Sequence, residues 1–409
     1  MEVLLANKYG YIKGGADTVF FNTKRLLEEH GNKVIPFCVK NDRNDPSLSE
    51  YSDYFAESPE IRNQNFFGKV KEVSNFFYNK GAARQLGKLL ERERPDIAHL
   101  HNIFNGLSMS ILPVLKKYRI PVIITLHDAR FICPSSYCTL RGKKCEQCLK
   151  RFGLNCGIYR CFHDEFINSW MCAFEMFQKE RLFHYDDYIE QYIFVSKFYK
   201  DLHAEKHDYF GRKGTVLYNF YKQVEAKETK HEDYFLYYGR IISSKGIGTL
   251  IQAVKELPNV KLRIAGTGDM LDDIKRMKLK NVECLGFIKG EELKDAIKNA
   301  SFIIVPSEWI ENNPMTIIEA YSYGKPVIGS RIGGIPEIIN EGNTGYVFNA
   351  FDKTDLMKKL IKASKISDEE YTRMSSAAYQ FARHNFSDAI HYEKLMNIYN
   401  QAIDNYENI

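Results

Sequence analysis

The sequence predicts an α/β protein built from two Rossmann-like, doubly wound domains that face each other across a cleft. The chain has 409 residues, which is more than one ordinary hydrophobic core accommodates. Two successive runs of strand-like segments alternate with helical patterns, and this alternation is typical of parallel sheets covered by helices. A charged stretch without either pattern, KQVEAKETKHED, separates the two runs and is typical of a linker. The cleft between two such domains is the default place for a ligand.

These observations divide the chain into four parts. Residues 1–215 form the first domain, with a cysteine-rich insertion at 133–161, and residues 216–232 form the linker. Residues 233–386 form the second domain. The last part, 387–409, is predicted to form a helix that packs back on the first domain.

In the first domain, apolar runs of strand length alternate with helical patterns. The predicted strands are 3–6, 33–38, 97–100, 122–126 and 193–196, and the predicted helices are 18–30, 82–93 and 166–184. The segment 41–77 is polar, aromatic and irregular, so we expect an insertion there. The strand at 193–196 is expected to close the domain.

The second domain restarts the same alternation. The predicted strands are 235–238, 261–265, 282–285, 302–305 and 326–329. The predicted helices are 248–256, a short one around 270, 291–299, 315–323, 353–364, 368–385 and the last one from 388 onward.

Charge and hydropathy argue against two classes of partner. A net charge of +5 is mild, and Lys and Arg form no cluster with stacking aromatics, so we expect no nucleic acid. No stretch approaches the ~18 apolar residues of a membrane span, and MEVLLANKYG lacks a signal-peptide core, so we expect a cytoplasmic protein. The basic balance would let the first domain lie against an anionic membrane, although scattered Lys and Arg are usually a solvated face.

The segment 306–330 carries two carboxylates in an unusual setting. It predicts a strand, a helix and a second strand, with Glu311 in the loop before the helix and Glu319 inside it. Both glutamates would lie near the carboxyl ends of parallel strands, where open sheets bind ligands. The alternative is that Glu311 is a surface loop residue and Glu319 a solvated helix residue, because a helix dipole also favours acids there.

The ends of that helix carry recognisable capping residues. Asn313 followed by Pro314 predicts an N-cap with proline at the first helical position, and Gly324 suits the left-handed conformation that ends a helix. The connecting residues Asn312, Asn313, Pro314 and Met315 are candidate donor-binding residues.

Two cations follow the first strand of the second domain. Arg240 and Lys245 lie in GRIISSKG, where Gly239 and Gly246 allow close approach, and this pattern favours a diphosphate clamp. The alternative is a solvated basic loop. There is no D-x-D pair to hold a divalent cation, so we expect these side chains to neutralise a leaving diphosphate themselves, with no cofactor required for catalysis.

Further glycine-lined loops follow other strands of the same sheet. Gly266 and Gly268 lie in AGTGD, and Gly333 and Gly334 lie shortly before Glu337. Three glycine-lined loops at the ends of strands in one domain favour a ligand that lies against the backbone.

In the first domain, the candidate ligand groups are one glycine loop and one histidine. Gly14 and Gly15 follow the first strand without a G-x-G-x-x-G pattern, so either a flexible turn or a ligand loop fits them. His127 opens the loop after the strand at 122–126, where polar groups reach a ligand, although a lone histidine is more often structural.

Six of the nine cysteines fall between Cys133 and Cys161, and Cys145 and Cys148 have the C-x-x-C spacing of a zinc knuckle. In a reducing compartment such a cluster favours metal over disulfides. Reduced, partly buried thiols are the alternative.

With these residues assembled, the chain resembles a retaining glycosyltransferase of the GT-B fold, glycosyltransferase family 4. The resemblance spans nearly the whole chain and is strongest over YYGRIISSKG, IAGTGDM, PSEWIENNPMTIIEAYSYGKPVIGS and GGIPEII, in that order.

The resemblance implies roles for the residues singled out above. Glu311 and Glu319 match the family's paired glutamates, Arg240 and Lys245 its diphosphate-binding pair, and His127 the histidine that contacts the donor sugar. Gly14 and Gly15 match its glycine loop. The implied reaction transfers a sugar with retention and without a metal, and since no covalent nucleophile is evident, we infer front-face attack.

Some members also carry a cysteine insertion after the histidine motif. Cys133, Cys145, Cys148 and Cys161 match its pattern, which implies a structural zinc. Asn219 stands where many members read Pro-Asn-Gly, and the acceptor side has no diagnostic motif.

The function implied is transfer of a sugar from a nucleoside-diphosphate sugar to a hydroxyl of a glycan or lipid-linked glycan acceptor, in cell-surface polysaccharide biosynthesis. Two alternatives stay open: a catalytically silent sugar-nucleotide-binding or scaffold protein of the same fold, and a sugar-nucleotide epimerase.

Overall fold

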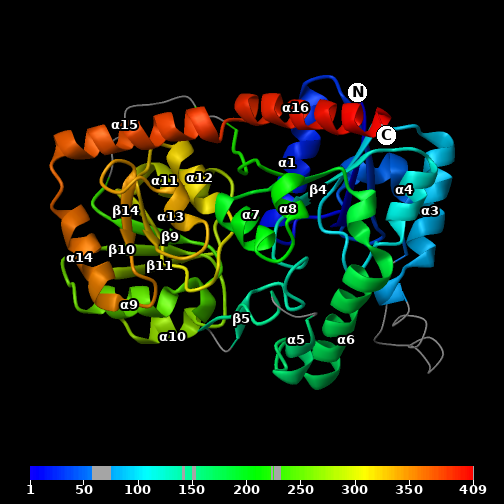
Figure 1. Ribbon diagram of the computed structural model, residues 1–409. Helices are drawn as coiled ribbons and strands as arrows, with labels where there is room; N and C mark the ends of the chain where they lie inside the picture. Colours follow the sequence, from blue (N-terminus) through cyan, green and yellow to red (C-terminus); the bar gives the residue numbers. More distant parts are fainter. Residues whose placement is uncertain (58–74, 141–142, 150–152, 223, 225–231, 409) are drawn as a thin grey trace.

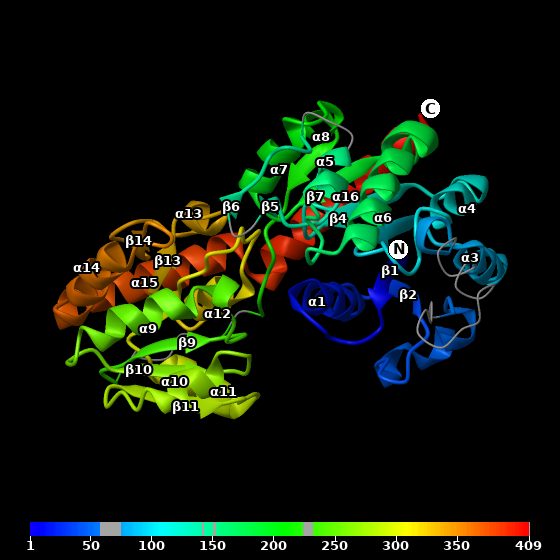
Figure 2. The ribbon, with the colours of Figure 1, turned by 90° about the horizontal axis from the view of Figure 1, so that it is seen from below.

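The computed structural model describes residues 1–57, 75–140, 143–149, 153–222, 224 and 232–408. These residues form two six-stranded parallel sheets, each flanked by helices, and a small antiparallel pair, β5 (Thr139–Leu140) with β6 (Lys143–Lys144). The two sheets belong to two domains that lie side by side (Figures 1 and 2). This architecture confirms the predicted fold class.

The first sheet has the strand order β2-β1-β3-β4-β7-β8. Its strands are β1 (Glu2–Tyr9), β2 (Lys33–Val39), β3 (Ile97–Leu100), β4 (Val122–Leu126), β7 (Gln191–Phe194) and β8 (Gly214–Val216). Its longer helices are α1 (Gly15–Glu29), α3 (Lys80–Arg92), α4 (Ile111–Lys117), α6 (Phe166–Phe177) and α7 (Lys197–Ala204). The strand order reverses between β1 and β3, and parallel sheets bind ligands at such a reversal.

The second sheet has the order β11-β10-β9-β12-β13-β14, which reverses between β9 and β12. Its strands are β9 (Phe235–Tyr238), β10 (Leu262–Ala265), β11 (Val282–Gly286), β12 (Phe302–Val305), β13 (Val327–Ser330) and β14 (Gly345–Phe348). Its helices are α9 (Ile247–Lys255), α10 (Leu271–Arg276), α11 (Glu291–Asn299), α12 (Met315–Ser322), α13 (Ile335–Ile338), α14 (Lys353–Ser364) and α15 (Asp368–Asn385).

The structure adds elements that the sequence pattern did not predict. Strand β8, and not the predicted strand at 193–196, closes the first sheet, and β14 is an unpredicted edge of the second. Within the predicted irregular insertion, Pro46–Tyr54 forms a 3-10 helix whose Leu48 and Tyr51 are buried in the core, while 58–74 lie outside the described residues. The predicted helix 166–184 is α6, continued by a π-helical stretch.

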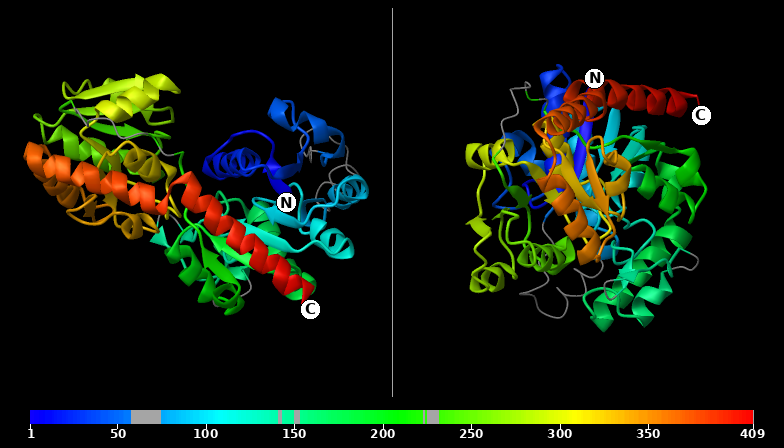
Figure 3. Two further views of the ribbon diagram at one scale, coloured as in Figure 1. Left: turned by 90° about the horizontal axis from the view of Figure 1, so that it is seen from above. Right: turned by 90° about the vertical axis from the view of Figure 1, so that its left-hand side faces the viewer.

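The last helix, α16 (Asp388–Glu407), leaves the second domain and packs on the first (Figure 3). Its Leu395, Ile398 and Tyr399 are buried in the core of the first domain. At the crossing, the Tyr221 backbone N–H donates to the Phe386 carbonyl at 3.0 Å, so the linker and the start of α16 run together between the domains. Among the described helices, none combines the length and the apolarity needed to cross a bilayer.

Candidate active site

A pocket at the carboxyl ends of β9 and β12 gathers five of the predicted site residues. Gly239, Arg240, Lys245, Glu311 and Pro314 all line it. The first three come from the loop after β9 and the last two from the segment after β12. The pocket therefore lies at the reversal of the second sheet, where the fold favours a ligand.

Lys245 and Glu311 form an ion pair inside this pocket. The Lys245 Nζ atom donates to Glu311 Oε1 at 2.5 Å, and the Ser307 hydroxyl donates to the same oxygen at 2.7 Å. The Ser330 hydroxyl in turn donates to the Ser307 carbonyl at 2.6 Å, which ties β13 to this loop. Charge-assisted bonds of this kind hold both partners in fixed positions. The sequence pattern did not single out Ser307.

Glu319 lies one turn into α12 and is not among the residues that line this pocket. Burial raises the pKa of its carboxyl group, and the neighbouring Tyr221 and Tyr238 hydroxyl groups lower it in part, although the Tyr238 hydroxyl is placed donating to the Thr316 carbonyl at 3.0 Å. Tyr221 belongs to the linker and Tyr238 to the end of β9. The two glutamates thus have different surroundings: Glu311 faces a cation, and Glu319 faces two hydroxyl groups.

The predicted N-cap role of Asn313 is wrong. Helix α12 begins at Met315 after Pro314 in the cap position, and no side chain caps it. The Asn313 Oδ1 atom instead accepts the backbone N–H of Asn219 at 2.8 Å, and Asn219 Nδ2 donates to the Asn313 carbonyl at 3.0 Å. The side chain of Asn313 thus bonds to Asn219 of the linker and does not cap α12. Asn313 therefore joins the segment before α12 to the linker.

Asn312 joins the same segment to the first domain. Its Nδ2 atom donates to the Leu126 carbonyl at 3.2 Å, and its Oδ1 atom accepts the Ser196 hydroxyl at 2.6 Å. Leu126 ends β4 and is followed directly by His127. The contact therefore brings the segment after β12 against the loop that carries His127.

A second contact between the domains uses the predicted glycine loop near Glu337. The Glu337 carboxylate accepts the backbone N–H groups of Lys197 and Phe198, at 2.8 and 2.9 Å, at the N-terminus of α7. An acid at this end of a helix is favoured by its unpaired N–H groups and its dipole.

Two glycines of the second domain allow backbone to pack on backbone. A Cβ atom on Gly333, whose φ is +58°, would lie 2.1 Å from the Glu311 carbonyl, and one on Gly266 would lie 1.9 Å from the Gly239 carbonyl. Any larger residue would displace the loops that carry Glu311 and Arg240. By contrast, apart from adjoining backbone, no atom of the described residues lies within 4 Å of a Cβ built on Gly14 or Gly15, so the loop before α1 has space beside it among these residues.

His127 belongs to a stack of neutral histidines. Its Nε2 atom lies 2.8 Å from His101 Nδ1, and the two rings stack at 5.1 Å. His99 stacks on His101 and is bonded to Thr125 and Tyr399. Burial lowers the pKa of His127 to about 4 and that of His99 to about 3, and it holds the pKa of His101 well below its ordinary value.

This stack fixes which nitrogen of His127 carries the proton. Among the described residues, the buried His101 Nε2 atom has no hydrogen-bond partner. A buried N–H without an acceptor is costly, so we assign the His101 proton to Nδ1, which donates to His127 Nε2. The neutral His127 then keeps its proton on Nδ1, and this N–H is available as a donor.

The cysteine-rich insertion gathers its thiols around one small cavity. Its lining includes all six cysteines of the insertion: Cys133, Cys138, Cys145, Cys148, Cys156 and Cys161. The Cys138 thiol donates to Cys133 and lowers the pKa of Cys133 to about 5, and Cys156 pairs similarly with Cys161. Within the described ranges, no three His, Cys, Asp or Glu side chains form a group that could hold a metal ion. The four cysteines that match the family's insertion nevertheless line the same cavity, and the structural zinc stays a prediction of the family resemblance.

Comparisons with known proteins agree with this geometry. The family model described as Glycosyltransferase Family 4 matches residues 13–222, and the one described as Glycosyl transferases group 1 matches residues 220–381. An uncharacterized 42.6 kDa protein in the cps region of Klebsiella pneumoniae is 26% identical over 357 residues, which are 83% of this chain and 87% of that protein.

Solved structures share the fold over almost the whole chain. HepE from Anabaena, solved in complex with UDP, has a TM-score of 0.66 at 14% identity, with 98% of this chain and 100% of that chain covered. The lipopolysaccharide outer core galactosyltransferase WaaB, in its apo form, has a TM-score of 0.65 at 18% identity, with 99% of both chains covered. These likenesses confirm the predicted GT-B fold, and since the first family model spans more than half of the sequence, the chain belongs to Glycosyltransferase Family 4.

Proposed function

We propose that the protein is a retaining glycosyltransferase that moves a sugar from a nucleoside-diphosphate sugar to a hydroxyl of a glycan or lipid-linked glycan. The observation that carries this proposal is the pocket in which Arg240, Lys245 and Glu311 meet at the reversal of the second sheet. The complex of HepE with UDP supports a nucleotide donor, and the cps-region relative supports a role in cell-surface polysaccharide biosynthesis.

Charge in the pocket suits departure of a nucleoside diphosphate. Arg240 and Lys245 would hold the diphosphate, and as the sugar–phosphate bond breaks, its growing negative charge is stabilised by cations that are already in place. An ammonium group has three donors, so Lys245 can bind phosphate oxygen while it keeps its bond to Glu311. Glu311 in turn holds Lys245 in position.

The remaining groups would position the donor. Glu319 can accept hydrogen bonds from a ribose diol when the diol replaces the Tyr221 and Tyr238 hydroxyl groups next to its carboxylate. The Nδ1–H of His127 can donate to a sugar hydroxyl from the other domain. The leaving phosphate oxygen would take the proton of the acceptor hydroxyl on the same face, which gives retention without a covalent intermediate.

Substitution of the two glutamates tests these roles. Glu319→Ala is expected to weaken donor binding, whereas Glu311→Ala is expected chiefly to lower turnover, because only Glu311 contacts the diphosphate-binding lysine. Donor affinity is measured by thermal shift with a panel of nucleotide sugars, and turnover by release of the nucleotide. Glu292→Ala, at an exposed position of α11, is the matched control.

Three results would contradict the assignment. Equal loss of affinity and rate in both variants would remove the division of roles. Binding of a nucleotide sugar without turnover would favour the silent binding or scaffold protein. Interconversion of the donor without an acceptor would favour the epimerase.

The structural zinc stays a prediction of the family resemblance. Metal analysis of protein purified without added zinc measures it, with about one zinc per chain expected if Cys133, Cys145, Cys148 and Cys161 bind it. A Cys145→Ser/Cys148→Ser variant should then lose the metal. Well-folded protein with far less than one zinc per chain would contradict the prediction and leave the thiol pairs as found.

A further inference from the structure

Three cations gather at the carboxyl edge of the first sheet. Lys8 lies near the end of β1, Lys13 lies in the loop before α1, and Arg43 lies in the loop after β2. Two half-buried tyrosines, Tyr9 and Tyr11, lie among them. We call these five residues the β1 cation cluster.

The cations of this cluster contact tyrosines. The Nζ atoms of Lys8 and Lys13 lie 5.0 and 4.8 Å from the centre of the Tyr9 ring, and Lys13 Nζ donates to the Tyr9 hydroxyl at 3.2 Å. The Arg43 guanidinium lies 4.2 Å from the centre of the Tyr11 ring and donates to its hydroxyl at 2.5 Å. Since the two rings lie 5.3 Å apart, the three cations share one small surface.

No carboxylate of the described residues forms an ion pair with these cations, although acids are close in the sequence. Asp17 is buried and accepts two backbone N–H groups of its own loop, and Asp45 accepts a backbone N–H at the start of the 3-10 helix. Asp42 is exposed and forms no ion pair within the described ranges. Burial would raise the pKa of Tyr9, but the two lysines lower it, so positive charge predominates at its hydroxyl group.

Other lysines of this sheet are neutralised. At the opposite edge, where β1 and β2 begin, Lys33 Nζ lies 3.3 Å from the Glu2 carboxylate and 2.6 Å from that of Glu93. Lys40, directly after β2, pairs with Glu57 at 2.8 Å. Like charges held close together are unfavourable without an opposite charge. The β1 cation cluster therefore has the charge and the donors of an anion site whose counter-charge comes from a ligand.

The cluster lies at the same edge of the sheet as His127. The Lys8 backbone N–H donates to the Asn102 carbonyl at 2.7 Å, and Asn102 directly follows His101, whose Nδ1 atom lies 2.8 Å from His127 Nε2. The Lys8 side chain lies on Gly106, where a Cβ atom would be 3.0 Å from its Cγ atom. The loops after β1 and β3 thus meet beside the histidine stack.

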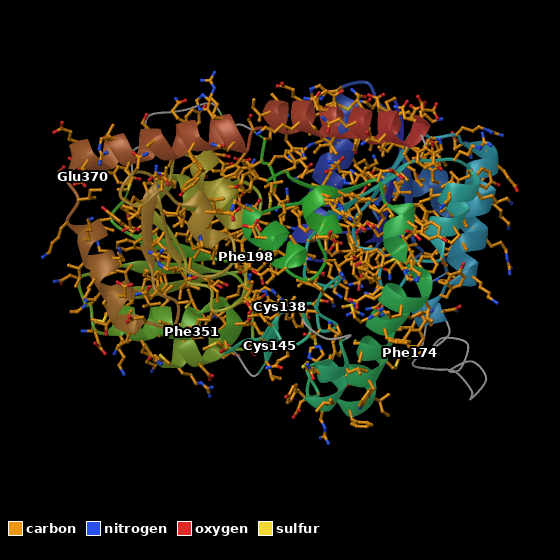
Figure 4. All side chains as sticks on the ribbon, in the orientation of Figure 1. Cys138, Cys145, Phe174, Phe198, Phe351 and Glu370 are labelled. Atoms are coloured by element: carbon orange, nitrogen blue, oxygen red, sulfur yellow. The ribbon has the colours of Figure 1, made fainter. Side chains whose placement is uncertain are left out.

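This edge also faces the domain that carries the donor pocket. Leu126, at the carboxyl end of β4, accepts the hydrogen bond from Asn312 of the second domain. Helix α1, which follows the cluster's loop, lies at the side of the first domain nearest the second (Figures 1 and 2). Figure 4 shows the same arrangement, with Phe351 on the second domain and Phe174 in a part of the first away from it.

We propose that the β1 cation cluster binds an anionic group of the acceptor, which is a phosphate or a carboxylate. The inference rests on the proposed function and deepens it, because it names the chemical class of the acceptor. Ammonium and guanidinium groups bind both anions through charge-assisted hydrogen bonds. The Tyr9 and Tyr11 hydroxyl groups accept bonds from the cations and keep their own protons, which they can donate to the same anion.

Isothermal titration calorimetry of the full-length protein without nucleotide sugar tests the proposal with two matched pairs of probes. Methyl β-glucuronide and methyl β-glucoside differ by a carboxylate, and geranyl diphosphate and geraniol differ by a diphosphate. At least one anionic probe should bind at least about tenfold more tightly than its neutral partner, and more weakly at high salt. The glucuronide would indicate an acidic sugar in the acceptor, and geranyl diphosphate a lipid-linked diphosphate.

Substitution of the two exposed cations locates the binding. Lys13→Met/Arg43→Met should lower the affinity for the anionic probe at least about tenfold, because two charged donors are lost. The matched control is Arg84→Met/Lys88→Met, since both side chains are exposed on α3 of the same domain and form no ion pair within the described ranges. This control removes the same charge and should keep the affinity.

The donor pocket offers the competing explanation for anion binding. Arg240→Met/Lys245→Met, which removes the cations of that pocket, should leave probe binding to the first domain in place. Binding that is lost in this variant and kept in Lys13→Met/Arg43→Met would overturn the proposal. So would the failure of both anionic probes to bind, or equal binding of each probe and its neutral partner. Turnover of a nucleotide sugar by protein that binds neither anionic probe would overturn this inference and leave the glycosyltransferase assignment intact.

Discussion

Replacing Lys245 by methionine is expected to lower the turnover number by about two to three orders of magnitude, the usual cost of removing one group that stabilises developing charge. The variant loses a cation beside the departing diphosphate. It also leaves the Glu311 carboxylate with the Ser307 hydroxyl as its remaining side-chain partner among the described residues of the pocket. Nucleotide release with the best donor of the panel measures the effect.

The matched control for this variant is Lys255→Met, at the exposed end of α9 and outside the pocket. It should keep the turnover of the unchanged protein. Lys245→Met/Glu311→Gln should be little worse than Lys245→Met alone if the two side chains act as a unit. Unchanged turnover in Lys245→Met would remove the diphosphate role from this pocket.

The free energy of unfolding is expected to fall steeply as the pH drops from 6.5 to 5. Burial lowers the pKa of His99, His203 and His391 to about 3 and that of His127 to about 4, from an ordinary value of 6.5. Below pH 6.5 the unfolded chain binds protons that the folded chain does not, so stability is complete above pH 6.5 and is lost toward the folded pKa values. At pH 5 each of these four histidines lowers the free energy of unfolding by about 2 kcal/mol relative to its value above pH 6.5.

Urea unfolding at pH 7.5 and pH 5.0 measures this loss. Burial raises the pKa of Asp128, Glu190 and Glu319, and these carboxyl groups act in the opposite direction. His203→Phe should therefore flatten the pH dependence by up to one proton, whereas His384→Gln, at an exposed position of α15, should leave it unchanged. Equal slopes in both variants would contradict the assignment to buried histidines.

Most of the fold could be predicted from the sequence because hydrophobic periodicity marks the buried strands. β12 and β13 are fully buried and appear as apolar runs. Strand β8, with three residues that begin at a glycine, is too short for such a pattern, and only its pairing with β7 makes it a strand. Short edge strands are decided by tertiary pairing, which a local pattern does not contain.

The same distinction between local pattern and tertiary contact separates the site residues that could be predicted from those that could not. The cation loop and the carboxylates were evident because each follows a strand directly, and parallel strands end at one edge. The partners of Asn313 and Glu319 were not, because Asn219 and Tyr221 lie in the linker, far from them in the sequence. Asn313 has a side chain that commonly caps helices, but its Oδ1 atom accepts the backbone N–H of Asn219 instead of one from α12.

One hydrogen bond between the domains limits the distance between Glu311 and His127. Asn312 follows Glu311 directly, and the carbonyl that Asn312 binds belongs to Leu126, which directly precedes His127. While that bond persists, the two side chains that would touch the donor from opposite domains are tied through their immediate backbone neighbours. A rotation of one domain against the other that keeps this bond and the Glu337 contacts with α7 would change the spacing between Glu311 and His127 less than the opening at the far edge.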